Sequence, residues 1–410
     1  MTLHETVRTR SGTVRYETPH QRVEIGNGVV ERLEEIVTAL GAGVVGVLAS
    51  NRNWREPLGR RVALGLDALE AVVSNEVVPH NPLPEAVRIG REFAASGVRV
   101  IVSVGGGSAS DLGKAVAAVM TSVRAGTEEV DLGRYFARIR NDGSVADHTM
   151  AGQPVPLVAV PTTLSGAELT PGAGVTEHGM KRVLWDQALA ARAVLYETSS
   201  LNELPDSIVA TTGMNAVAHA VEATYSSMGN GIGDALALAG LERLAAGMLR
   251  YLAIGDRSEQ AKTEMFTGAV LAGRALCVAR VCLHHAICHV LGAHHGVPHG
   301  AANAAMLSHV VDLNEAGAAQ PLALVAASMQ SAAGSVLGTT FPARAPGAIL
   351  REFESRIGAP TTLGQIGLTT VDVEGVVAGL REERGLAFNP VPVTDDDIRN
   401  LLQRATGAAP

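Results

Sequence analysis

The 410-residue sequence contains little cysteine and no long apolar run. Its three cysteines, Cys277, Cys282 and Cys288, are an odd number within one short segment, which is not typical of a disulfide framework. No uncharged apolar stretch reaches the roughly 20 residues that a membrane helix requires, and the first residues lack the apolar core of a secretion signal. We therefore expect a cytoplasmic protein that does not interact with a membrane.

Positive charge is also scarce, because 33 Lys and Arg against 41 Asp and Glu give a formal net charge of −8. Such a chain has no overall positive field to attract a polyanion, so nucleic acid is not expected as a partner. Hydrophobic residues make up 47% of the chain and charged residues 18%, which excludes a disordered or coiled-coil protein. The length favours one large or two moderate domains.

The first half of the sequence alternates strand-like and helix-like patterns. Residues 44–49, 100–104 and 157–160 are nearly continuous apolar runs of strand length, and residues 83–96 have apolar positions at helical spacing. This alternation predicts a parallel α/β sheet with helices on both faces. A His-Gly pair inside residues 174–185 predicts an edge hairpin.

The pattern changes after Leu204. Pro205 and Asp206 stand where the first turn of a helix favours proline and an acid, so a helix is predicted to start here. From there onward alanine and leucine recur at helical spacing, as in residues 234–252 and 263–279.

These patterns divide the chain into three parts: a polar, loose extension over residues 1–22, an α/β domain over 23–204 and an all-helical domain over 205–410. Residues 121–153 are polar and lack periodicity, which predicts an inserted loop within the α/β domain.

Three glycines, Gly105, Gly106 and Gly107, follow the second predicted strand. Consecutive glycines let the backbone turn tightly and approach a ligand. Ser108 is expected to cap the following helix, with Asp111 completing a box-like cap. The free amides and the helix dipole then form an anion site. The motif is neither G-x-G-x-x-G nor a Walker P-loop, so a tight turn without a ligand is the alternative interpretation.

A second loop, containing Thr162, Thr163 and Ser165, follows the strand predicted to end at Val160. Open α/β sheets bind their ligands at the carboxyl ends of parallel strands, which is where these hydroxyls stand. Ordinary loop chemistry is an equally good interpretation of this loop taken by itself.

Seven of the thirteen histidines lie between residues 284 and 309. His285 and His289 are four residues apart and share a helix face, and a Gly-containing turn is expected to return His299 to the same pocket. Upstream, Asn215 and His219 have the same spacing. Inward-facing groups from two helices plus a loop histidine are typical of a metal or proton-transfer site. Taken singly, four others are interpreted as core histidines: His284, His294, His295 and His309.

In this order and spacing, four segments resemble the iron-containing (group III) alcohol dehydrogenase family, which is related in fold to dehydroquinate synthase: GGGSASDLGK, PTTLSGAE, TTGMNAVAHAVE and HHAICHVLGAHHGVPHG. Within that family the chain is most similar to the maleylacetate reductase branch, for example in the tail FNPVPVTDDDIRNLL. The resemblance implies a dinucleotide-binding α/β domain, a helical catalytic domain, an active cleft between them and a homodimer.

The resemblance also implies which residues bind the cofactor, NADH or NADPH. Its pyrophosphate would lie on Gly105, Gly106, Gly107 and Ser108, with Asp111 in the same turn, and Thr162, Thr163 and Ser165 would line its ribose and nicotinamide side. Asn51 belongs to the segment after the first strand, where no acidic residue is present to bind a ribose 2′-hydroxyl. Arg52 in the same segment offers a partner for a 2′-phosphate, which leaves the choice of nucleotide open.

In metal-using members of the family an aspartate and three histidines hold the ion, and these positions correspond to Asn215, His219, His285 and His299, with His289 beside the nicotinamide. An amide supplies no charge to a divalent cation, so we predict chemistry without a metal, in which imidazoles polarise the substrate carbonyl. The expected reaction is hydride transfer from NAD(P)H to a small oxo-acid, with maleylacetate to 3-oxoadipate as the leading case.

Two alternatives remain at this stage. One is a metal-dependent alcohol or aldehyde dehydrogenase in which Asn215 still binds the ion. The other is a biosynthetic homologue that acts on another substrate, possibly without redox chemistry. Leu164, Ala286 and Gly300 depart from the pattern of maleylacetate reductases and leave the substrate open.

Overall fold

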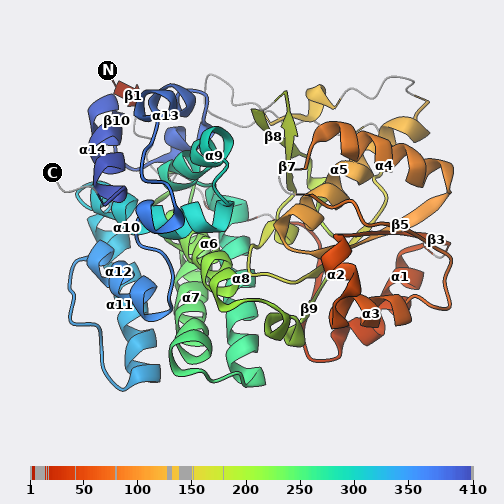
Figure 1. The fold of residues 1–410 in the computed structure, drawn as a ribbon, viewed down its shortest axis with the longest axis horizontal. Coiled ribbons are helices and arrows are strands. Elements are labelled where there is room, and N and C mark those ends of the chain that lie inside the picture. Colours follow the sequence, from red (N-terminus) through yellow and green to blue (C-terminus); the bar gives the residue numbers. More distant parts are fainter. Residues whose placement is uncertain are drawn as a thin grey trace. The chain divides into compact units, whose positions relative to one another are not determined.

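The computed structural model describes residues 2–4, 14, 16, 18–41, 43–78, 81–126, 132–137, 150, 152–178 and 180–407. Backbone contacts divide the chain into two compact units. The sheet unit is Pro19–Leu204, and the helical unit joins Met1–Thr18 to Pro205–Pro410. Both units are shown in Figure 1, in which colours follow the sequence.

The sheet unit is built on six parallel strands in the order β2-β9-β6-β5-β3-β4. Their bounds are β2 (Arg22–Gly26), β3 (Val44–Ala49), β4 (Ala71–Ser74), β5 (Val98–Gly105), β6 (Leu157–Pro161) and β9 (Ala193–Glu197). Strands β6 and β9 are buried along their whole length, as expected for inner strands covered on both faces. The predicted parallel α/β sheet is therefore confirmed.

Helices cover both faces of this sheet. They are α1 (Leu33–Gly41), α2 (Asn51–Arg55), α3 (Pro57–Leu64), α4 (Leu83–Ala95) and α5 (Gly107–Arg124), with short 3₁₀ turns η1 (Val29–Arg32), η2 (Gly133–Tyr135), η3 (Ala167–Leu169), η4 (Gln187–Leu189) and η5 (Thr198–Glu203). Leu33 of α1 and Val62 of α3 belong to one buried cluster with the strand valines. Helix α4 uses another face, where Phe93 occupies the space left by Gly46 of β3.

A hairpin formed by β7 (Gly172–Glu177) and β8 (Met180–Trp185) makes a separate two-stranded antiparallel sheet. The predicted hairpin is therefore present, but it is not an edge of the main sheet. Its first strand lies against α5, where Nζ of Lys114 donates to the carbonyls of Ala167 and Gly172. Of the predicted insertion 121–153, the first four residues belong to α5 and most of the others lie outside the described residues.

The helical unit contains α6 (Asp206–Tyr225), α7 (Gly231–Met248), α8 (Glu259–Ala279), α9 (Leu283–His295), α10 (His299–Asn314), α11 (Ala319–Leu337), α12 (Pro346–Arg356), α13 (Val373–Leu380) and α14 (Asp395–Ala405). Shorter turns are the π-helical η6 (Leu249–Ile254) and the 3₁₀ turns η7 (Gly364–Ile366) and η8 (Arg384–Phe388). Residues 2–4, which the sequence placed in a loose extension, form β1 and pair antiparallel with β10 (Val393–Thr394). No single helix in the described part of the chain is long and apolar enough to cross a membrane. Helices α8 and α9 reach that length and hydropathy only as a pair, and the chain bends by 100° between them.

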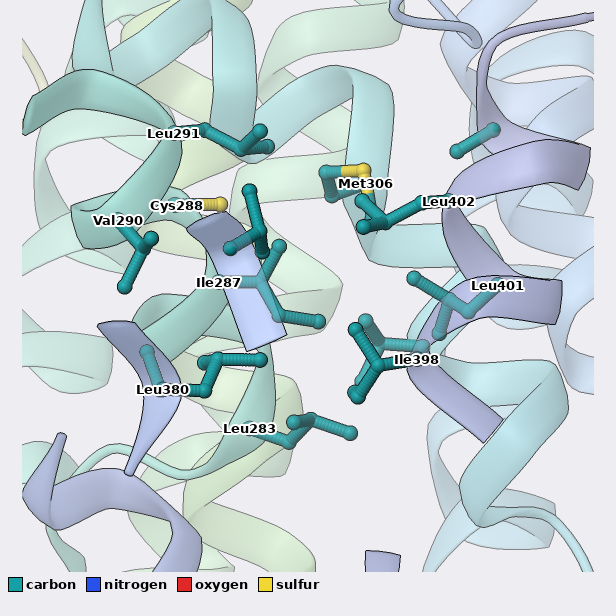
Figure 2. Close-up of a cluster of buried hydrophobic side chains, with 14 of the residues drawn as sticks. Leu283, Ile287, Cys288, Val290, Leu291, Met306, Leu380, Ile398, Leu401 and Leu402 are labelled. Carbon is teal, nitrogen blue, oxygen red and sulfur yellow. The ribbon is translucent and has the colours of Figure 1, made fainter. Parts of the chain in front are cut away.

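Helix α9 is anchored through an apolar face. Leu283, Ile287 and Leu291 recur at intervals of four residues and are fully buried in a cluster with residues of α10, α13 and α14 (Figure 2). Because this face is fixed in the core, the histidines on the other faces of α9 have fixed positions.

Helices α7 and α8 pack through glycines, and both lie against α6. At Gly268 of α8 a β-carbon would lie 2.6 Å from the amide nitrogen of Leu244 and 2.7 Å from the carbonyl oxygen of Gly240, both in α7. The close approach of the two backbones therefore requires glycine at position 268.

We predict that Gly268→Ala lowers the free energy of unfolding by about 1–3 kcal/mol, because the added methyl forces two backbones apart. Gly334→Ala in α11 is the matched control, since a β-carbon there meets no neighbouring atom within 4 Å. The control is expected to gain about 0.5–1 kcal/mol from helix propensity. Urea unfolding followed by circular dichroism measures both, and similar destabilisation by both variants would contradict the packing argument.

Candidate active site

The glycine turn lies at the carboxyl end of β5, where the chain passes into α5. Gly105 has a φ of +148°, and a β-carbon on it would lie 2.8 Å from Nδ2 of Asn53 and 2.9 Å from Cβ of Ala109. Glycine is therefore required here for both conformation and space. Helix α5 starts at Gly107, and its first amides are available to an anion.

The prediction that Ser108 and Asp111 cap this helix is wrong. The N-cap residue is Gly106, and no side chain caps the helix, so Ser108 lies within the first turn. Asp111 has different partners: its carboxylate accepts from the backbone N–H of Gly174 at 3.0 Å and from Nζ of Lys114 at 3.2 Å. The physical reason is that β7 runs beside α5, so a strand amide competes successfully for the carboxylate. Asp111 ties the hairpin to α5.

The loop after β6 lies directly against the glycine turn. The N–H of Thr162 donates to the carbonyl of Gly105 at 3.0 Å. A β-carbon on Gly106 would lie 3.2 Å from the side chain of Thr163, and one on Gly107 would lie 3.1 Å from Oγ of Ser165. The hydroxyl of Thr163 is buried and has no hydrogen-bond partner among the described residues, so it can bind a ligand. The cradle and this hydroxyl fit the phosphate and ribose of a nucleotide.

Asn51 is the first residue of α2, just beyond β3, and its side chain is exposed. The residue of this segment that lies beside the glycine turn is Asn53, whose N–H is capped by Ser50 Oγ at 3.1 Å. Sequence reasoning missed Asn53, because no spacing rule connects it to Gly105.

In the helical unit, α6, α9 and α10 bring the expected histidines together. The ring of His219 stacks on that of His285 with centroids 4.8 Å apart. The ring centroid of His299 lies 5.9 Å from that of His285 and 5.6 Å from that of His289. The last residue of α9 is His295, and the C-cap Gly296 has a φ of +65°. Gly300 allows α10 to approach the backbone of Thr211 in α6. The Gly-containing turn therefore returns His299 to the cluster.

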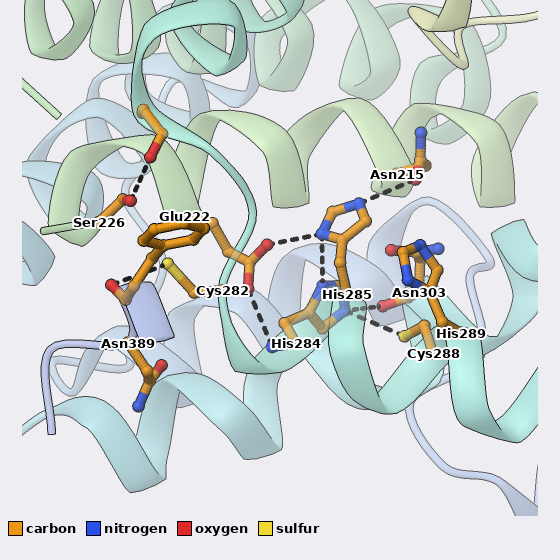
Figure 3. A network of polar contacts seen from close by, with 12 residues as sticks. Asn215, Glu222, Ser226, Cys282, His284, His285, Cys288, His289, Asn303 and Asn389 are labelled. Atoms are coloured by element: carbon orange, nitrogen blue, oxygen red, sulfur yellow. Dashed lines mark hydrogen bonds and ion pairs between the residues drawn. The ribbon is translucent and has the colours of Figure 1, made fainter. Parts of the chain in front are cut away.

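A buried glutamate that sequence reasoning missed lies at the centre of this network (Figure 3). Glu222 has no exposed surface, and its Oε2 lies 2.6 Å from Nδ1 of His285. Its Oε1 accepts from the backbone N–H of His284 at 2.9 Å. Burial raises the pKa of this carboxyl. A signal existed in the sequence, because Glu222 lies three residues after His219 and seven after Asn215, which places it on the same face of the helix.

His284, expected to be an ordinary core histidine, is part of the same network. Its Nε2 lies 2.9 Å from the carbonyl oxygen of Asn303 in α10, and its Nδ1 lies 3.4 Å from Nδ1 of His285. Burial lowers the pKa of His284 to about 4 and that of His219 well below its ordinary value. Both rings are therefore neutral at neutral pH.

His289 is the more open member, and its Nδ1 lies 3.2 Å from Oε2 of Glu383, just before η8. Glu383 is 94 residues away in the sequence, so no local pattern could have indicated it.

Four positions correspond to the metal ligands of the resembled family: Asn215, His219, His285 and His299. They fit a divalent cation poorly. Asn215 supplies a neutral amide, and its Oδ1 is 3.3 Å from Nε2 of His285, within hydrogen-bond range. Glu222, His284 and His285 form a different group among the described residues. Each offers one possible ligand atom, and these three atoms all lie within 4.8 Å of one another. Those atoms already contact one another in the network above.

The residue that directs the chain into α9 has an unusual backbone. Arg280 follows the last residue of α8 and has φ +68° and ψ 153°, a region that is essentially restricted to glycine. A non-glycine residue held there costs about 1–3 kcal/mol. The strain is located three residues before the helix that carries the histidines.

We predict that Arg280→Gly is more stable than Arg280→Ala by about 1–2 kcal/mol, because both variants lose the side chain but only glycine relieves the backbone. Urea unfolding of the two variants measures this difference. Equal stabilities would show that residue 280 is unstrained.

Comparisons with known proteins identify the family of the chain. Residues 19–198 match the family model for iron-containing alcohol dehydrogenase, and residues 209–406 match that for the C-terminal part of the Fe-containing alcohol dehydrogenase family. The chain is 29% identical to a maleylacetate reductase of Rhizobium sp. (strain MTP-10005) over 96% of this chain and 98% of that one. It is 32% identical to maleylacetate reductase 2 of Cupriavidus pinatubonensis, covering 75% of this chain and 76% of that one.

Solved structures give the same result. The crystal structure of maleylacetate reductase from Rhizobium sp. strain MTP-10005 superposes with a TM-score of 0.77 at 28% identity, covering 98% of this chain and all of that one. A putative alcohol dehydrogenase from Ralstonia eutropha JMP134 gives a TM-score of 0.79 at 28% identity, with 96% and 98% coverage. The chain belongs to the iron-containing alcohol dehydrogenase family and is an NAD(P)-dependent oxidoreductase.

Proposed function

We propose that this oxidoreductase reduces maleylacetate to 3-oxoadipate with NADH or NADPH and without a metal ion. The observation that carries the metal-free part is the amide of Asn215, which stands 3.3 Å from Nε2 of His285 where metal-using relatives have an aspartate. The substrate is supported by the similarity to maleylacetate reductases along nearly the whole chain. On the basis of the family alone, we extend the proposal to a cytoplasmic homodimer.

The proposed reaction needs a hydride acceptor and a stabilised oxygen. When bound, NADH or NADPH would supply a hydride to the alkene carbon of maleylacetate that is not attached to the ketone carbon. The alkene electron pair would then form a double bond between the other alkene carbon and the ketone carbon, and the C=O electron pair would move onto the oxygen to give an enolate. A proton added to that other alkene carbon would complete 3-oxoadipate. Imidazole N–H groups of the cluster and the amide of Asn215 stabilise the enolate oxygen through hydrogen bonds.

His289 is the best proton source within the cluster. It is partly exposed, whereas His219 and His285 are buried, and it contacts the carboxylate of Glu383. A histidine that contacts both a carboxylate and solvent can regain its proton after each turnover.

We predict that the purified enzyme oxidises NADH or NADPH in the presence of maleylacetate, followed at 340 nm, and keeps this activity after dialysis against a chelator. Elemental analysis is expected to find far less than one iron or zinc per chain. Asn215→Asp, which restores an anionic ligand, is expected to retain more metal. Stoichiometric metal with chelator-sensitive activity would refute the metal-free part. Activity with simple ketones or aldehydes but not maleylacetate would refute the substrate.

We predict that Gly106→Ala weakens NADH binding by at least about tenfold, or roughly 1.4 kcal/mol, because its methyl enters the space against Thr163 where the pyrophosphate is expected. Fluorescence titration with NADH measures the Kd. Gly334→Ala serves again as the control, since it adds the same methyl on α11 without a neighbour. Unchanged affinity in Gly106→Ala would remove the glycine turn from the cofactor site.

A further inference from the structure

Glu222 connects two helices through both of its oxygens. From α6, its Oε1 accepts from the backbone N–H of His284 in the first turn of α9, and its Oε2 lies 2.6 Å from Nδ1 of His285. The carboxylate has no exposed surface. A buried carboxylate is tolerated only when it is hydrogen-bonded or paired, so these contacts are obligatory rather than incidental.

The surrounding atoms decide where His285 carries its proton. Nε2 of His284 faces the carbonyl of Asn303 at 2.9 Å, and a carbonyl can only accept, so this nitrogen carries the hydrogen of the neutral ring. Nδ1 of His284 is then a bare acceptor, 3.4 Å from Nδ1 of His285. Two acceptors, this nitrogen and Oε2 of the Glu222 carboxylate, therefore face Nδ1 of His285, so Nδ1 carries a hydrogen. Oδ1 of Asn215, which also can only accept, faces Nε2 of the same ring at 3.3 Å, so Nε2 carries a hydrogen as well.

We propose that Glu222 is the positioning residue of the active site. It accepts the hydrogen on Nδ1 of His285 and thereby orients the ring so that Nε2–H points toward Asn215 and the reacting oxygen of the substrate. The inference rests on the proposed function for the role of Nε2 in the reaction, but the placement of the proton follows from the contacts alone. A carboxylate that orients a functional imidazole through its other nitrogen is a general means of fixing tautomer and ring orientation.

The test replaces Glu222 by glutamine. In Glu222→Gln the side chain has one accepting oxygen and one donating NH₂ group. If the oxygen keeps its hydrogen bond from the backbone N–H of His284, the NH₂ group faces His285, and Nδ1 of His285 then has to accept without a hydrogen of its own. We expect kcat to fall by about 100-fold or more, the size of effect typical of a lost acid–base or orienting group. The Kd for NADH is expected to stay within about twofold, because nucleotide binding is assigned to the glycine turn.

Glu354→Gln is the matched control. Glu354 is also fully buried in the helical unit, on α12, and its pKa is raised to about 8 by burial, but its charged neighbours are Arg351 and Asp312 and not the histidine cluster. Both substitutions exchange a buried carboxyl for an amide, so an effect on stability alone should appear in both. Only Glu222→Gln is expected to lower kcat.

The direct readout is ¹⁵N NMR of histidine-labelled protein, with His285 assigned by the signals missing in His285→Gln. In the wild type, Nδ1 of His285 is expected to carry a proton, and in Glu222→Gln it is expected to lose that proton. A bare Nδ1 in the wild type, an unchanged pattern in Glu222→Gln, or a kcat loss no larger than in Glu354→Gln would each overturn the proposal. Because the wild-type spectrum, assigned with His285→Gln, needs neither substrate nor Glu222→Gln, a bare Nδ1 there overturns the proposal even if maleylacetate is not reduced or Glu222→Gln does not fold.

Discussion

The helical unit depends on one constraint, which is that the carboxylate of Glu222 has no access to water and must find its partners within the protein. Leaving a buried charge unpaired costs several kcal/mol, more than most single contacts contribute. The partners are His285 and the backbone N–H of His284, so α6 and the first turn of α9 must stay within hydrogen-bond distance. Helices α7 and α8, which pack on each other through glycines, both lie against α6, and the turn at Arg280 connects α8 to α9.

This arrangement explains how a helix rich in histidine can be rigid. Helix α9 buries an apolar face of leucine and isoleucine in the core and presents His285 and His289 on a different face. The His285 ring is then held by Glu222 and Asn215 (Figure 3), and His289 contacts Glu383. Hydrogen-bond donors that are fixed before the reaction need no reorganisation when charge develops on the substrate. A flexible loop with the same histidines would not provide that advantage.

The sequence predicted those features that depend on local spacing. Val44–Ala49 was recognisable as a buried strand from its nearly continuous apolar run, and His285 with His289 as one helix face from their spacing of four residues. The partners of Asp111 and His289 were not predictable, since Gly174 and Glu383 reach them only through tertiary packing. Ser108 shows the same limit: it has the right residue type for a cap, yet the N-cap is Gly106, two residues earlier.

The amide at position 215 becomes understandable once Glu222 is considered. A carboxylate at 215 would place a second negative charge beside His285, on the side opposite Glu222. With a divalent cation between the ligands such a charge is compensated, but without one the two buried carboxylates share a single imidazole, and like charges in a dry site disfavour each other strongly. An amide keeps the hydrogen-bonding oxygen and removes the charge. Under the proposed metal-free chemistry, Asn215 is therefore the residue that leaves the Glu222–His285 pair electrically balanced.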